Sequence, residues 1–215
     1  MRAASKALSR FIPFWLFLFF FKVAGAIHYT MFPVLAESVF PVWQVGLIVG
    51  GAAGLQMLMD VPAGYLLDRY GYTRLLAYST AIFCASAALF LLGVTPLVVL
   101  ASAFLGAFGW VFFNPGVNAY VLVQAQKAFA GRFMALRDMV SSGGTVSAMI
   151  LLPYLLEAPL HVMIGVVCTG FVLAIGALTR APRDTTSISE TPKIAHQSWY
   201  IRRHFYTMCY ERSRG

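Results

Sequence analysis

Charged residues are scarce in this chain. Asp, Glu, Lys and Arg make up 11% of its 215 residues, whereas hydrophobic residues make up 60%. A soluble domain usually carries about 25% charged residues. The chain therefore has too little polar surface to face water on all sides. This composition excludes an ordinary soluble globular protein and predicts a protein whose solvent is a lipid bilayer.

Acidic residues are the scarcer of the two charge types, with 8 Asp and Glu against 16 Lys and Arg. The resulting net charge of +8 matches a cytoplasmic membrane face that carries anionic lipid. We therefore expect the bilayer as a partner and no nucleic acid.

Cysteine is also rare. Cys84, Cys168 and Cys209 are scattered, with neither a metal-site spacing nor a disulfide framework, and we expect them to be small packing residues. A His-Glu-x-x-His motif, a paired His and Asp, and a Ser or Cys nucleophile arrangement are likewise absent from the sequence. The sequence therefore predicts no enzyme, no metal and no cofactor.

Long apolar runs are what the chain does contain. Each is close to the ~20 residues that cross a bilayer core, and charge, Gly or Pro separates them. The six segments are approximately 11–31, 43–67, 75–94, 97–122, 134–156 and 160–179. Their short connections require adjacent antiparallel helices, and the sustained period of two that a barrel needs is absent from the sequence. We predict an all-α membrane protein with six transmembrane helices.

The basic residues indicate the orientation of these segments. They precede the first segment, lie between the second and third, surround the connection of the fourth and fifth, and follow the sixth, apart from Lys22 within the first segment. The opposite loops hold only Glu37, Glu157 and His161. The positive-inside rule then predicts a multi-pass protein of the plasma or inner membrane with both termini in the cytoplasm.

Three regions follow from this reading. Residues 1–10 form a cytoplasmic N-terminus, residues 11–179 form the six-helix domain, and residues 180–215 form a cytoplasmic linker or tail. Within the tail, Ile201, Phe205 and Met208 stand at helical spacing among arginines, which predicts an amphipathic helix on the membrane surface.

Residues 1–26 also have features of a signal peptide, with a basic start, an apolar run and the small residues Ala24-Gly25-Ala26. However, apolar character resumes after Lys22 and extends to Leu35, and cleavage would leave five spans. We expect this segment to be retained as the first helix, and we expect the phenylalanines of residues 11–21 to face lipid.

Polar residues gather in the stretch DVPAGYLLDRYGYTRLL, between the second and third segments. Gly64 lies on the last turns of a helix and permits close helix packing. Asp68 and Arg69 lie at the helix end, Gly71 supplies the turn, and Arg74 begins the next helix at headgroup level. An ordinary polar hairpin loop would explain these residue types, but not their arrangement.

These five residues resemble the Gly, Asp-Arg, Gly, Arg motif that the major facilitator superfamily carries between its helices 2 and 3. The preceding Asp60, Pro62 and Gly64 are similar to an acidic-x-Pro-x-Gly form found in some members. The resemblance covers residues 1 to about 180 and implies the N-terminal six-helix half of the family's fold, a 3+3 inverted repeat. It also implies alternating access, in which two halves rock about a central site near the midplane.

In the family, the carboxylate of this motif latches the outward-facing state against the opposite half, and its arginines join a cytoplasmic charge cluster. By resemblance, Asp68 is a conformational latch, with Arg69 and Arg74 as its neighbours. The chain departs from the family where Gln124 and Gln126 replace the usual acidic partner, and an arginine that some proton-coupled members carry in helix 4 is absent. The Gly-Pro signature of drug antiporters in helix 5 is absent too, so these departures argue against proton-driven drug export.

Charged groups at mid-bilayer depth mark solute pathways by default. Lys22 and Asp60 lie at similar depths, so we hypothesise that they pair or share a water-filled cavity, with a purely structural salt bridge as the alternative. Lys22 and Tyr29 share one face of the first helix with Ala26 and Pro33. His28 points about 100° away from Tyr29, toward a neighbouring helix or the solute.

Asn114 and Asn118 stand four residues apart beside Pro115 and Gly116, a combination that predicts an unwound turn with carbonyls free for a ligand. Glycines at 46, 50 and 54 form a smooth stripe on the second helix. The small residues of 141–147 form a similar patch on the fifth, and both predict close packing. The candidate substrate or coupling residues are Lys22, His28, Tyr29, Asp60, Asn114 and Asn118.

The sequence thus predicts half of a transporter for a small solute, with a coupling ion and a second six-helix half as partners. That half comes from the same gene, a split gene or a second copy, and we expect the chain to be a fragment or a truncated form. The alternative is a membrane assembly or sensor protein that uses a half-transporter scaffold without transport. Fold alone leaves the substrate open.

Overall fold

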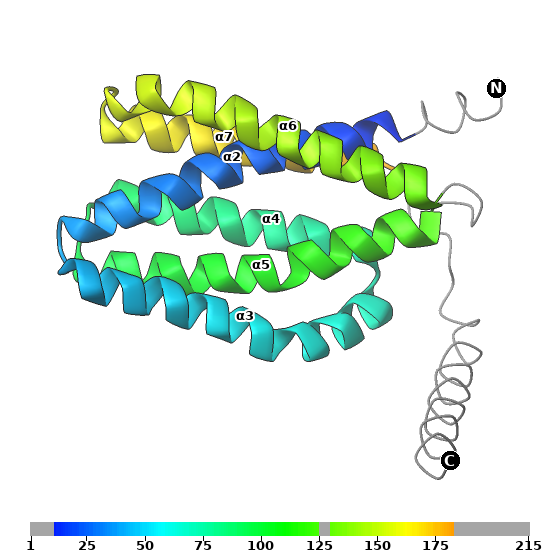
Figure 1. Ribbon diagram of the computed structural model, residues 1–215, viewed down its shortest axis with the longest axis horizontal. Coiled ribbons are helices and arrows are strands. Elements are labelled where there is room, and N and C mark those ends of the chain that lie inside the picture. Colours follow the sequence, from blue (N-terminus) through cyan, green and yellow to red (C-terminus); the bar gives the residue numbers. More distant parts are fainter. Residues whose placement is uncertain (1–10, 125–129, 183–215) are drawn as a thin grey trace, which may run out of the picture. The chain divides into compact units, whose positions relative to one another are not determined.

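The computed structural model describes residues 11–124 and 130–182 (Figure 1). In this part of the chain, six helices are long and apolar enough to cross a membrane, and the rest is short connections. The helices are α2 (Ile12–Glu37), α3 (Val42–Tyr70), α4 (Tyr72–Ala88, extended by the 3₁₀ turn η1, Leu89–Leu92), α5 (Pro96–Gln124), α6 (Ala130–Leu156) and α7 (Leu160–Leu178). The predicted all-α membrane fold is confirmed.

The helix ends differ from the predicted segments. α2 continues to Glu37 and α6 already begins at Ala130, beyond the expected bounds of 31 and 134. Apolar composition marks only the stretch that suits hydrocarbon, whereas a helix continues for as long as its backbone hydrogen bonds do. Arg137, one of the basic residues around the predicted connection of the fourth and fifth segments, lies inside α6. The predicted surface helix at 201–208 lies outside the described residues.

The helices pack as two groups of neighbours (Figure 1). α4 lies against α5, and α3 packs on the other side of α5, whereas α2 lies between α6 and α7. Contacts of α7 with α4 and of α6 with α5 join the groups. α2 is therefore a central helix of the bundle.

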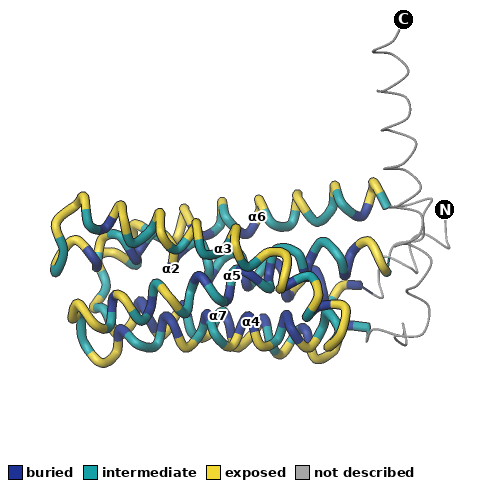
Figure 2. Tube along the Cα trace, turned by 90° about the horizontal axis from the view of Figure 1, so that it is seen from below, coloured by how far each residue is buried: buried dark blue, intermediate teal, exposed yellow. Residues whose placement is uncertain are grey.

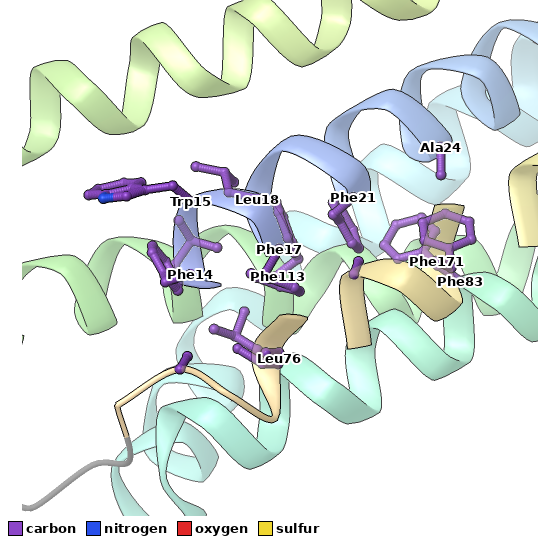
Figure 3. Close-up of a cluster of buried hydrophobic side chains, with 14 of the residues drawn as sticks. Phe14, Trp15, Phe17, Leu18, Phe21, Ala24, Leu76, Phe83, Phe113 and Phe171 are labelled. Carbon is purple, nitrogen blue, oxygen red and sulfur yellow. The ribbon is translucent and has the colours of Figure 1, made fainter. Parts of the chain in front are cut away.

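Aromatic side chains of α2 form the core. Phe14, Phe17 and Phe21 are at most 1% exposed and point toward α4, α5 and α7 (Figure 3). The Phe21 ring stacks on Phe113 of α5, with 3.6 Å between the ring centroids. Our expectation of lipid-facing phenylalanines was therefore wrong for these three residues, whereas Phe19 and Phe20 are half-buried. Positions 14, 17 and 21 share one helical face, and that face meets protein.

α2 runs without a break through the small residues considered as a cleavage site. Ala24 is buried there, and a Cβ built on Gly170 of α7 would lie 2.9 Å from the Ala24 Cβ. α2 and α7 can approach this closely because position 170 has no side chain. Cleavage after residue 26 would remove most of the central helix, so the structure argues against it.

α3 and α6 are the least covered helices. In the most apolar stretch of each helix, 6% of α3 and 17% of α6 is buried, against 44% of α2. Exposed residues recur along both helices (Figure 2). A Cβ at Gly46, Gly50 or Gly54 would meet nothing within 4 Å. The glycine stripe is therefore real but has no neighbour among the described residues.

Candidate functional site

The junction of α3 and α4 consists of one residue. Gly71 adopts φ 87° and ψ 143°, a conformation that side chains with a Cβ rarely take. Its N–H donates to the Leu67 carbonyl at 3.0 Å, and its carbonyl accepts from the Leu75 N–H at 3.3 Å. The predicted turn at Gly71 is thus present, and the helices on both sides come closer to it than the expected bounds of 67 and 75.

The other motif residues surround this junction. The Tyr72 hydroxyl donates a hydrogen bond of 2.9 Å to Asp68 Oδ1, and the Arg69 guanidinium carbon lies 5.6 Å from the centroid of the Tyr70 ring. Asp68, Arg69 and Arg74 are exposed. Gly64 is half-buried, with open space where a side chain would stand. The motif thus presents its charges at one end of the bundle.

Lys22 lies within the bundle and not at its end. Its ammonium stands 4.8 Å from the centroid of the Trp110 ring and 5.4 Å from that of Phe113. The negative face of an aromatic ring attracts a cation. Trp110 was missed by sequence reasoning because an indole in an apolar helix gives no signal of its own.

Lys22 and Asp60 do not form the ion pair that we hypothesised. Asp60 is exposed on α3, and Arg137–Asp138 is the ion pair found within residues 11–124 and 130–182. The prediction compared depths along two helices, but α2 and α3 scarcely touch. Similar depth did not bring the two charges together.

His28 belongs to a buried polar network that links three helices. Its Nε2 lies 3.1 Å from Ser86 Oγ of α4, and His28 is 4% exposed. The Ser86 hydroxyl donates to the Ser102 carbonyl at 2.9 Å, and the Ser102 hydroxyl donates to the Ser86 carbonyl at 3.0 Å. When both hydroxyl protons bond these carbonyls, His28 Nε2 carries the proton and donates to Ser86 Oγ, which is the assignment we adopt. Nδ1 is then an acceptor, without a partner among the described residues.

A cleft of about 60 Å³ adjoins this network. It has room for a few water molecules, and its wall combines aromatic rings with few polar groups. The lining residues are His28, Tyr29, Phe32, Pro33, Val49, Ala52, Gln56, Phe83, Ser102, Ala103, Gly106, Ala107 and Trp110. Of the predicted site residues, the structure brings together His28 and Tyr29. It adds Gln56, whose signal was a lone amide in an apolar run.

Asn114 and Asn118 lie elsewhere on α5 and do not line the cleft. Both are half-buried, and Asn118 Oδ1 has no partner within the described part of the chain. α5 stays helical through Pro115, so the predicted unwound turn is wrong. A Cβ at Gly116 would come within 3.2 Å of side-chain atoms of Leu67 and Leu76. α5 is thus tightly packed against α3 and α4 at this position.

Comparison with known proteins decides the family. The family model described as Major Facilitator Superfamily matches residues 14–209. The chain belongs to the major facilitator superfamily. As a superfamily chain with six apolar helices in its described part, it is an integral, multi-pass membrane protein with a half-family fold.

Curated relatives within the superfamily include multidrug resistance proteins named MdtH. The chain is 28% identical over 151 residues to that of Proteus mirabilis (strain HI4320), covering 68% of this chain and 38% of the relative. It is 28% identical over 155 residues to those of Yersinia pestis (strain Pestoides F) and Yersinia pseudotuberculosis serotype O:1b (strain IP 31758), covering 69% of this chain and 38% of each relative. The matched part of this chain thus spans well under half the length of these relatives.

Proposed function

We propose that this chain acts as the N-terminal half of a transporter that moves a small organic solute across a membrane by alternating access. The observation that carries the proposal is the superfamily match over residues 14–209, together with a cleft lined by residues from α2, α3, α4 and α5. The name of the relatives, multidrug resistance protein, supports an organic molecule as the solute.

A second six-helix half would complete the transporter. α3 and α6 are the helices with the least protein cover, and the glycine stripe at 46, 50 and 54 has no neighbour within the described residues. A smooth, uncovered helix suits a partner that slides during a rocking motion. The 38% coverage of the relatives is consistent with a partner half of similar size.

The charged end of the α3–α4 junction would serve as a conformational latch on the cytoplasmic side. Asp68 is exposed next to a turn of one residue, so its carboxylate can meet an oppositely charged or helix-end group of a second half. Arg69 and Arg74 are exposed beside it and would add charge to the same contact. These residues would act by holding a conformation and not by chemistry.

The proposal is tested by dye accumulation in cells that express the chain from its own locus. We expect the wild type to change the accumulation of fluorescein or ethidium, and Asp68→Asn to abolish that change with equal protein in the membrane. A control, Gln124→Ala, removes a polar side chain at the same end of the bundle and should keep transport. Wild-type cells that match a deletion strain for both dyes would refute transport.

The orientation is tested separately. A cysteine placed at Arg74 should react with a membrane-impermeant maleimide only from the cytoplasmic side, in a background where native cysteines are replaced. Labelling of intact cells from outside would overturn both the orientation and the latch.

A further inference from the structure

Lys22 lacks a carboxylate partner within the described part of the chain. Its ammonium contacts the faces of Trp110 and Phe113 instead. An unpaired charge inside a membrane domain costs several kcal/mol, and cation–π contacts offset only about 0.5–2 kcal/mol of that. Ten residues of helix separate Lys22 from the start of α2 at Ile12, or about 15 Å. Lys22 is therefore a candidate functional residue that could bind a negatively charged group.

A second cation lies on the neighbouring helix. Arg137 of α6 has a side chain that is 19% exposed, and its NH1 lies 2.7 Å from Asp138 Oδ1. Its Nε is buried, without a hydrogen-bond partner in residues 11–124 and 130–182. Part of the guanidinium thus remains free to donate.

The packing of α2 against α6 places both cations along one seam. Near one end, the Phe133 ring contacts those of Phe11 and Trp15, and farther along, a Cβ at Gly144 would lie 2.9 Å from the Lys22 Cβ. Arg137 lies between these contacts, two turns before Gly144 and hence on the same face of α6. Arg137 and Lys22 therefore lie along the same contact between α2 and α6.

The charges of this seam do not balance. The seam holds two cations, Lys22 and Arg137, and one carboxylate, Asp138, which pairs with Arg137 at 2.7 Å and has a side chain that is 64% exposed. Trp110 connects the seam to the cleft, because its ring contacts the Lys22 ammonium and also lines the cleft. No Asp or Glu lines that cleft. The region thus combines excess positive charge with an aromatic, uncharged wall.

We propose that Lys22 and Arg137 bind the anionic group of the solute, a carboxylate or a phosphate, and that its organic part lies against Trp110. The inference rests on the proposed function and narrows it to small amphipathic organic anions. The Arg137 fork supplies directional donors, and Lys22 supplies a mobile point charge. An anion in the seam would balance the excess positive charge of the two side chains.

The test measures binding of a matched pair of probes to the full chain in phosphatidylcholine nanodiscs by calorimetry. Benzoate and benzamide have nearly the same shape, but benzoate alone is charged. We expect benzoate to bind the wild type more tightly, and Lys22→Met and Arg137→Met each to weaken benzoate about tenfold or more without changing benzamide. Lys22→Arg keeps the charge and should retain most of the preference. Arg132→Gln, at the exposed start of α6, is the matched control and should behave like the wild type.

Nanodiscs with added phosphatidylglycerol distinguish the two sources of an anion. If a lipid headgroup occupies the seam, this lipid weakens benzoate binding in the wild type but not in Lys22→Met, and the anion site stands with a lipid as its ligand. Equal binding of benzoate and benzamide in both lipids, or a preference that survives both substitutions to Met, would overturn the site.

The outcome is separable from the proposed function. Anion binding that depends on Lys22 and Arg137, without dye transport in cells, keeps the site and rejects the transporter. Dye transport without any preference for benzoate keeps the transporter and rejects the site.

Discussion

The Tyr72 hydroxyl donates a 2.9 Å hydrogen bond to Asp68 across the turn at Gly71. The pair is exposed at its carboxylate end, so its own contribution to stability is about 1 kcal/mol or less. Its effect is geometric, because it fixes one of the two carboxylate oxygens and leaves the other available.

Tyr72→Phe should lower the rate of transport without abolishing it. The substitution removes the hydrogen bond that orients the Asp68 carboxylate, but it leaves the charge of Asp68 in place. Asp68→Asn should abolish transport, because a neutral amide is a weaker partner for a charged group of a second half. The dye assay, normalised to protein in the membrane, measures both. Equal loss in the two variants would show that the hydrogen bond, and not the charge, is what transport needs.

Gly71→Ala should lower the free energy of unfolding by about 1–3 kcal/mol, because a Cβ is strained at φ 87°. Gly64→Ala is the matched control. It is seven residues earlier, in helical backbone with open space around it, and should be neutral or slightly stabilising. Thermal unfolding in nanodiscs compares the two. A Gly71→Ala protein as stable as the wild type would contradict the positive φ.

Ser86→Ala should cost about 1–3 kcal/mol, because it leaves the buried His28 Nε2–H without an acceptor. Ser102→Ala should cost less, since the bond between His28 and Ser86 survives. Ser147→Ala removes a hydroxyl that bonds only the carbonyl of its own helix and should stay within about 0.5 kcal/mol. Chemical unfolding in mixed micelles ranks the three. If Ser102→Ala is the costliest, the assigned direction of the hydrogen bonds is wrong.

Phe113→Ala should destabilise the bundle by about 3 kcal/mol or more, because it opens a cavity beneath Phe21 and removes one of the rings that face Lys22. Phe104→Ala on the same helix is the control. That ring is 57% exposed, so its removal leaves no enclosed cavity, and the loss should be within about 1 kcal/mol. Equal losses in thermal unfolding would contradict the aromatic core.

The helices were predictable because bilayer thickness dictates the length of an apolar run. The Gly71 turn was predictable too, because glycine between two apolar helices readily adopts the backbone conformations that a tight turn needs. By contrast, the sequence could not show that Phe14 and Phe21 face protein. Lipid and a protein core are both apolar, so the same residues suit either.

Depth along a helix was predictable, but rotation about its axis was not. The hypothesis of a Lys22–Asp60 pair compared depths only, and it failed because Asp60 is exposed on α3 and forms no ion pair with Lys22. The hydrogen bond between His28 and Ser86 could not be predicted for the same reason. It depends on the rotation of α2 and α4 about their axes, which decides which faces of the two helices meet. Arg137 was missed for a different reason, because it was grouped with the basic residues around the connection before α6, although the predicted segment 134–156 already contained it.

A connection of one residue at Gly71 gives α3 and α4 little freedom to move independently. Any tilt of α3 must be absorbed by torsion about two backbone bonds or else be transmitted to α4. α4 is fastened to α5 by the hydrogen bond from Ser79 to the Gly109 carbonyl, at 2.7 Å. Although much of its surface lacks protein cover, α3 is thus tethered to α4 at Gly71, and a tilt of α3 must pivot about that residue.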